Sequence, residues 1–431
     1  MNHLQRSSLG FSLRHTALAA CLALGALAAP GAWAQAAAAA PAAAASAPTV
    51  RPEVGKLLQA ARDAMGTGNF KESLARIAEV QAMPSLEPYE QYVVERMRAS
   101  AALGNKDMPL ALKSLEAAAQ SPFTPAADRP LLIETAIKVA VQVDKFDVAK
   151  RWLTTYLAGA NPKPEFRRLY PQVLQQLGDH AGVIAEVSPI VAADVAAKRV
   201  TPEATLRMLA FSQNEIKDKA GYTRTLELLV GSTGKVDYWA DLLARVHNRD
   251  GFADERLRLD MYRLRRAVGV DLDAGELGDM AYRASQAGLP AEAQALLDEG
   301  FANGTLGKDA NAANDKKLRD QVTKVALQDR NTLADNEAAA TKAKEGNVAL
   351  NLGMALSGMG LHDRALAMIA LGQSKGGLRR PDDALLHVGV AQFRAGRIDD
   401  AKRSFEAVKG DDGTADLARL WLLHLNRPAR K

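Results

Sequence analysis

The sequence predicts an all-α protein, an α-solenoid in which antiparallel helix pairs stack on one another. A spaced pattern of small residues recurs near the C-terminus, and apolar residues follow the helical period along most of the chain. Aromatic residues make up only 5% of the chain, so alanine supplies much of the 48% apolar content, which favours closely packed helices over a sheet. A fixed period of about 20–50 residues is typical of stacked repeats, whose units complete their cores against their neighbours.

The recurring pattern places small residues in both helices of a pair and a glycine in the turn between them. A glycine in the first helix and an alanine in the second let two backbones approach, and the turn glycine can take a positive φ angle. Corresponding residues of the last two pairs are 36 positions apart, and those of an earlier pair precede the first of these two by 72. The residues are Gly288 and Ala293 in the earlier pair, Gly353, Gly360 and Ala365 in the next, and Gly389, Gly396 and Ala401 in the last.

Residues 1–34 have the pattern of a cleaved secretory signal peptide. Arg6 and Arg14 precede the apolar stretch 16–29, and small residues at positions 32 and 34 predict cleavage between Ala34 and Gln35. A retained membrane helix is the first alternative, but the stretch falls short of the roughly 20 apolar residues that span a bilayer. Lipoprotein processing at Cys21 is the second, and the apolar run that continues past Cys21 favours the later cleavage site.

Residues 35–50 form an Ala/Pro tract without amphipathic pattern, which we interpret as a disordered linker between the signal and the folded body. Cys21 is the single cysteine of the chain, so cleavage at Ala34 leaves a mature protein without thiols. A thiol-free protein in an oxidising compartment must be stabilised by packing alone.

The body from residue 51 onward divides into helix pairs. Residues 51–303 are expected to form degenerate repeats, residues 304–345 a polar, divergent repeat, and residues 346–409 two clear units; residues 410–431 follow as a capping helix and tail. The expected pairs in the degenerate part cover 52–81, 88–120, 128–158, 163–192, 202–231, 236–269 and 274–303, and the capping helix covers 414–425.

The two clear units resemble tetratricopeptide repeats. Leu352-Gly353, Gly360, Ala365 and Ile369 match the Leu-Gly, Gly, Ala and large apolar positions of that family, and the next unit repeats the match 36 residues later instead of the usual 34. The resemblance implies a right-handed superhelix whose first helices line a concave groove, and it is closest to exported proteins of this type from Gram-negative bacteria. It places six side chains in that groove, with the alternative that they are core or lie beneath the capping helix: Tyr282, Leu350, Met354, Leu386, Val390 and Phe393.

Residues that would support catalysis or metal binding are scarce. No two histidines of the mature chain lie four residues apart on one helix, and there is no thiol, so neither a metal nor another cofactor is expected. The densest charge lies in residues 254–269, where arginines alternate with leucines; diluted by acidic residues, it is interpreted as a solvated helix face with internal ion pairs.

The functional expectation is a non-catalytic protein–protein interaction scaffold exported to the periplasm, with partners in the cell envelope. Nucleic acid is not expected as a partner, because the formal net charge of +5 comes from interleaved basic and acidic residues. An accessory factor bound to cell wall or polysaccharide, which assists an envelope enzyme or assembly machine, is the alternative. Carbohydrate faces need exposed aromatic rings, so the burial of Trp152, Trp239 and Trp421 discriminates between the two. An enzyme in its own right is the least favoured class.

Overall fold

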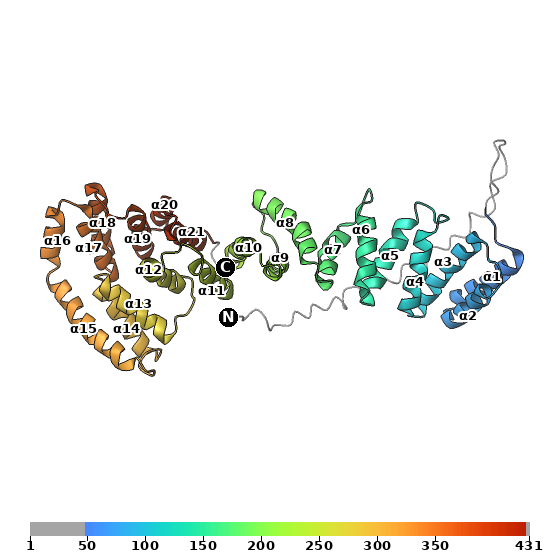
Figure 1. Ribbon diagram of the computed structural model, residues 1–431, viewed down its shortest axis with the longest axis horizontal. Helices are drawn as coiled ribbons and strands as arrows, with labels where there is room; N and C mark the ends of the chain where they lie inside the picture. Colours follow the sequence, from blue (N-terminus) through green and yellow to red (C-terminus); the bar gives the residue numbers. More distant parts are fainter. Residues whose placement is uncertain (1–47, 428–431) are drawn as a thin grey trace. The chain divides into compact units, whose positions relative to one another are not determined.

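The computed structural model describes residues 48–427, and within them the secondary structure consists of 21 helices without a strand (Figure 1). Consecutive helices pack against each other in pairs, so the predicted all-α class is confirmed. The predicted signal peptide, its cleavage site at Ala34 and Gln35, the alternative at Cys21 and residues 35–47 of the linker lie outside the described residues. None of the described helices is long and apolar enough to span a membrane.

The chain divides into two units, Met1–Val187 and Ser188–Lys431. The N-terminal unit contains helices that pack in sequence order, each against the one before and the one after, from α1 to α7. Its core is built from alanine and branched residues with Trp152, Tyr156 and Phe166. The helices are α1 (Pro52–Gly66), α2 (Phe70–Gln81), α3 (Pro88–Gly104), α4 (Met108–Gln120), α5 (Arg129–Gln142), α6 (Phe146–Leu157) and α7 (Pro164–Gln176), followed by α8 (His180–Ala196), in which the division falls.

One turn geometry joins the helices of most pairs in both units. A residue with positive φ ends the first helix, and the next residue donates its N–H to the carbonyl five residues back, as from Asn69 to Ala64 (2.8 Å) and from Arg397 to Gln392 (2.9 Å). Lys106, Asp144 and Lys217 occupy the positive-φ position in three pairs, where other pairs have a glycine, such as Gly68, Gly178 and those of the later repeats. A non-glycine residue there costs about 1–2 kcal/mol. These three pairs therefore lose the glycine of the pattern although the turn is retained.

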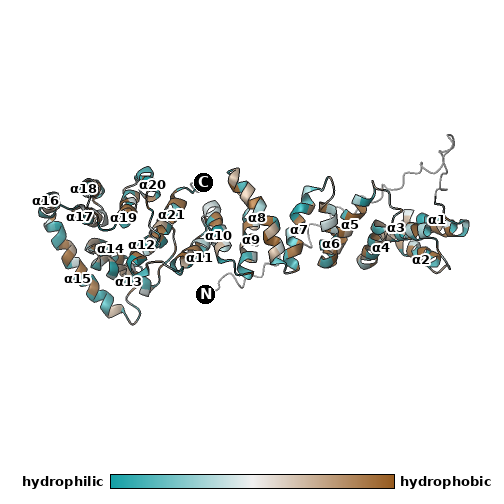
Figure 2. Cartoon of the chain, turned by 45° about the horizontal axis from the view of Figure 1, so that its top comes forward, coloured by the Kyte–Doolittle hydropathy of each residue, from teal (hydrophilic) through white to brown (hydrophobic). Residues whose placement is uncertain are grey.

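The C-terminal unit begins with pairs of the same kind and then returns on itself (Figures 1 and 2). The last helix packs on its neighbours and also on α10 and α12, while α14 packs on α17. The helices are α9 (Glu203–Glu215), α10 (Lys219–Thr233), α11 (Val236–His247), α12 (Asp254–Ala267), α13 (Ala274–Gln286), α14 (Pro290–Ala302), α15 (Ala312–Asn331), α16 (Leu333–Lys342), α17 (Gly346–Gly358), α18 (His362–Lys375), α19 (Pro381–Arg394), α20 (Ile398–Glu406) and α21 (Thr414–Leu425).

Polar contacts fasten the C-terminal end of the chain to α10–α12. The Ala253 N–H donates to the Asp412 carbonyl at 2.8 Å, and the Arg249 guanidinium pairs with Asp416 at 2.6 Å. Arg256 forms ion pairs with Asp383 and Asp412. The predicted capping helix is present as α21. It packs not only on α19 and α20, which precede it, but also on α10 and α12 from the beginning of this unit.

The polar stretch 304–345 forms two helices that pack on different neighbours. α15 packs on α13 and α14, whereas α16 packs on α17 and α18. Few of their side chains are buried, chiefly Val322, Ala326 and Ala340, which agrees with the polar composition of the stretch.

The small residues of the repeat pattern lie where helices approach closely. A Cβ atom built on Gly353 would lie 2.7 Å from Ile369 Cγ1 and 2.9 Å from the Ala365 carbonyl oxygen, and one built on Gly389 would lie 2.4 Å from the Phe405 ring. Ala293, Ala365 and Ala401 are buried. Gly288, Gly360 and Gly396 hold the turns, with φ between 74° and 77°.

Replacing Gly353 by alanine should destabilise the C-terminal unit although alanine is the better helix former. The added methyl group meets backbone atoms of α18, and we expect overpacking to cost about 1–3 kcal/mol. The matched control is Gly55→Ala in α1, where nothing lies within 4 Å of the new Cβ and the helix should gain about 1 kcal/mol. Denaturation followed by circular dichroism measures both, and stabilisation by both changes would contradict the close approach of α17 and α18.

Candidate binding site

Four of the six side chains predicted to line an open groove are buried in the structure. Leu350 and Met354 of α17 are 5% and 4% exposed, and Leu386 and Val390 of α19 are 0% and 1% exposed. Leu350 and Met354 belong to a core cluster that extends from α12 to α19. The expectation of an exposed groove is therefore wrong for these four, because the return of the chain places other helices over the surfaces that an open stack would leave free.

The fifth residue, Phe393, lies beneath the capping helix. Its ring is 5.0 Å from Trp421 and 5.8 Å from His424, both on α21, and Trp421 also stacks on Phe405 of α20 at 5.6 Å. The sixth residue, Tyr282 of α13, is exposed and lines a separate cleft between α13 and α15. The alternative that these residues are core or lie beneath the capping helix thus describes five of the six.

A cleft of about 440 Å³ opens inside the C-terminal unit, and Val390 and Phe393 are among its lining residues. Helices that are distant in sequence build it together, since α12, α13 and α14 form one side and α17, α19 and α21 the other. Apolar side chains and guanidinium groups alternate along its lining. The lining residues used below are Arg263, Arg266, Ala295, Ser357, Phe393, Arg394 and Trp421 together with Glu292.

Buried ion pairs form the floor of this cleft. Arg263 of α12 is 5% exposed and donates to both oxygens of Glu292 on α14, at 3.0 and 2.7 Å. It also donates to Asp260 at 2.8 Å, and Arg394 of α19 reaches Glu292 at 2.5 Å. His387 of α19 approaches the other oxygen of Asp260 at 3.1 Å. These five residues, hereafter the ionic cluster, join three helices.

The ionic cluster keeps its carboxylates charged in spite of burial. Burial by itself raises the pKa of the Asp260 carboxyl, but the neighbouring His387 and Arg263 outweigh it and lower that pKa to about 2. Burial also opposes ionisation of Glu292, and the guanidinium groups of Arg263 and Arg394 lower its pKa far below the usual range. The two acids in turn raise the pKa of Arg263 against the effect of its burial.

The sequence-based interpretation of residues 254–269 as a solvated helix face is wrong for the middle of α12. Asp260 and Arg263 are buried, as are Leu257, Met261 and Leu264, so most faces of the helix are covered. The internal ion pairs that the charge pattern predicted are present, between Arg258 and Asp254 in the first half of the helix and between Arg263 and Asp260 in its buried middle. The partners of Arg263 on α14 and of Asp260 on α19 are 29 and 127 residues away, so local sequence gave no sign of them.

Two polar atoms at the cleft have no hydrogen-bond partner among the described residues. Ser357 Oγ of α17 and Trp421 Nε1 of α21 are both buried, and both residues are among those that line the cleft. An unsatisfied buried donor costs about 1–3 kcal/mol, so such groups call for an acceptor. The cleft therefore combines apolar surface with the guanidinium groups of Arg266 and Arg394, each paired with an acid, and with two residues that carry unpartnered donors. Within residues 48–427 no group of three or more His, Cys, Asp or Glu side chains could hold a metal ion.

Comparisons with known proteins do not place this chain in a family. No protein-family model matches the chain, and no curated protein sequence matches it. Among solved structures, yeast Tom70 is similar at 10% sequence identity over 87% of this chain and 89% of its own, with a TM-score of 0.23. At that TM-score the two structures do not superpose as wholes, so the assignment of helix pairs depends on the packing and turns described above.

Removing the central acid of the ionic cluster should destabilise the C-terminal unit strongly. Glu292→Gln leaves the buried Arg263 without its main counter-charge, and breaking such a pair costs about 3–5 kcal/mol. The control is Glu299→Gln on the same helix, which loses an ion pair with Arg266 whose side chains are 34% and 50% exposed, and it should change stability by less than about 1 kcal/mol. Urea unfolding of both variants measures the difference, and equal effects would contradict the central place of Glu292.

Proposed function

We propose that this protein is a non-catalytic interaction scaffold that binds a polypeptide segment of a partner in the cleft of its C-terminal unit. The observation that supports this most is the pair of unpartnered buried donors, Ser357 Oγ and Trp421 Nε1, beside apolar lining. A bound segment presents backbone carbonyl oxygens as acceptors for these donors and a side chain for the apolar wall at Phe393. The volume of about 440 Å³ accommodates a side chain with its flanking backbone, which is the scale of an anchor residue.

The alternative role at a cell wall or polysaccharide has less support. Trp152, Trp239 and Trp421 are 6%, 0% and 1% exposed, so none of them offers a face for stacking on a sugar ring. The aromatic rings that meet at the cleft pack on one another, as Phe393 does on Trp421. Guanidinium groups and isolated donors at an apolar wall suit a peptide better than a carbohydrate.

Filling the cleft should abolish binding without unfolding the protein. Ala295 of α14 lines the cleft and is exposed, so Ala295→Phe places a ring in the opening without disturbing the core. The control is Ala339→Phe at an exposed position of α16 outside the cleft lining. Peptides selected from a displayed random library on the wild-type chain should lose at least tenfold in affinity for the first variant and retain affinity for the second. Unchanged affinity for Ala295→Phe would place binding elsewhere.

We also propose that the chain acts in the periplasm of a Gram-negative bacterium. Arg6 and Arg14, the apolar stretch 16–29 and the small residues before Gln35 support export, and the absence of cysteine after that position suits an oxidising compartment. Partners are then proteins of the cell envelope.

Periplasmic material from a Gram-negative host should have an intact mass that begins at Gln35. The expectation follows from the small residues at positions 32 and 34, which suit signal peptidase. A chain lipidated at Cys21, or an uncleaved chain in the cytoplasm, would contradict it. A Cys21→Ser variant is the control, because the predicted cleavage does not depend on that residue.

A further inference from the structure

A second cleft, separate from the one proposed to bind a partner segment, lies between α13 and α15. It has a volume of about 400 Å³ and is lined from α13 by Gly275, Gly278, Asp279 and Tyr282, and from α15 by Asp315 and Leu318 among others. Gly278 lies directly against Asp315, since a Cβ built on this glycine would be 3.0 Å from Asp315 Oδ1. The lack of a side chain there brings the carboxylate to the wall of the cleft.

Asp315 is a buried acid without a counter-charge. It is 7% exposed, and its Oδ2 atom has no hydrogen-bond partner in the described part of the chain. Burial, and then the negative charge of Asp309, raise the pKa of this carboxyl. A buried carboxylate is normally paired, because removing an isolated charge from water costs several kcal/mol. Asp315 therefore lacks a cationic partner that its position calls for.

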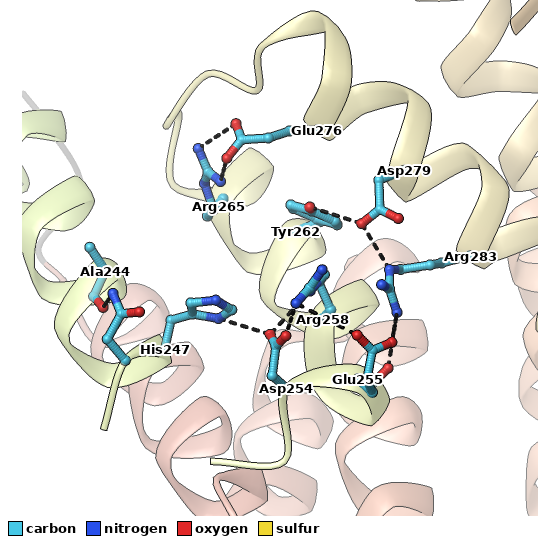
Figure 3. Close-up of polar contacts among 11 residues, drawn as sticks. Ala244, His247, Asp254, Glu255, Arg258, Tyr262, Arg265, Glu276, Asp279 and Arg283 are labelled. Carbon is cyan, nitrogen blue, oxygen red and sulfur yellow. Dashed lines mark hydrogen bonds and ion pairs between the residues drawn. The ribbon is translucent and has the colours of Figure 1, made fainter. Parts of the chain in front are cut away.

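The other charged groups around the cleft do not supply that cation. Asp279 is already satisfied, since Tyr262 Oη donates to it at 3.0 Å and Arg283 Nε at 2.8 Å (Figure 3). Arg283 also binds Glu255, as Figure 3 shows. Lys317 lines the cleft, but it is exposed and does not bind Asp315 Oδ2, which has no hydrogen-bond partner in the described part of the chain. No metal-binding group of acids is present among residues 48–427, so a metal ion does not fit either.

We propose that this cleft binds an organic cation, a guanidinium or primary ammonium group on an apolar stem, with Asp315 as its counter-charge. The exposed ring of Tyr282 lies at the cleft and offers a cation–π face. Leu318 and the glycine-lined wall of α13 receive the stem. Asn311, Asn314 and Gln321 place amide oxygens around the opening, where they accept the remaining N–H groups. The cation is either a free small molecule or an arginine or lysine side chain of a polypeptide.

Calorimetric titration of the full chain with two probes tests the proposal. Agmatine represents the free cation, and a capped Ala-Ala-Arg-Ala-Ala peptide represents the side chain; the same peptide with citrulline is the neutral control. Saturable binding of either cation, at least tenfold tighter than the citrulline peptide, is expected. If only the arginine peptide binds, the natural ligand is a side chain of a polypeptide. If agmatine binds as tightly as the peptide, the natural ligand is a free small cation. Failure of both cations to bind overturns the proposal.

Variants locate the binding and separate it from folding. Asp315→Asn should weaken binding at least tenfold and raise the melting temperature, because it removes an unpaired buried charge. The matched control is Asp320→Asn, an exposed acid on the same helix outside the cleft, which should bind as well as wild type. Equal affinity for Asp315→Asn and wild type overturns the proposal. If Asp315→Asn does not fold, the Tyr282→Ala variant tests the proposal instead. Its affinity for the cations should fall several-fold, and an affinity equal to that of the wild type would show that the cations do not bind in this cleft. Because the segment-binding cleft shares none of these residues, the Ala295→Phe variant should bind both cations normally.

Discussion

The C-terminal unit depends on an acid, Glu292, held between two guanidinium groups from helices far apart in the chain. Arg263 comes from α12 and Arg394 from α19, 102 residues beyond Glu292. Both carboxylate oxygens are occupied and the acid is 6% exposed, so without the two guanidinium groups Glu292 would be left as an uncompensated buried charge. Such a cluster adds little net stability compared with apolar packing, but breaking it is costly, which makes it a constraint on how the helices meet.

That constraint explains why the unit is closed where an open stack of repeats is predicted. Asp260 binds His387, and Arg256 binds Asp383 and Asp412, so α12 is held to α19 and to the segment before α21 by charge as well as by packing. Trp421 of α21 then covers Phe393 and Phe405. The residues that resemblance assigns to an open groove become core, and a smaller cleft with unpartnered donors remains between the two sides.

The two clefts differ in chemistry, and the difference follows from their helices. The cleft on the ionic cluster has its acids neutralised by arginines and leaves neutral donors unsatisfied, at Ser357 and Trp421. The cleft between α13 and α15 leaves an acid unsatisfied, at Asp315. One therefore calls for acceptors on an apolar ligand and the other for a cation, which is why a peptide is proposed for the first and a charged amine or guanidinium for the second.

The sequence by itself determined the helices, the pairing of most of them and the close approach at Gly353 and Gly389, because periodicity, turns and small residues act over a few positions. The single repeat expected over 304–345 is not observed, since α15 packs on α13 and α14 and α16 packs on α17 and α18. The sequence also predicted a capping helix at 414–425, close to the observed α21. It predicted the helix pairs around Lys106, Asp144 and Lys217 too, but it could not reveal that these residues adopt positive φ in their turns without a glycine. The tertiary structure alone decided the burial of α12, the closure of the C-terminal unit and both clefts. The physical reason is sequence separation: His387 lies 127 residues from Asp260 and Arg394 lies 102 residues from Glu292, so only the folded chain brings those charges together.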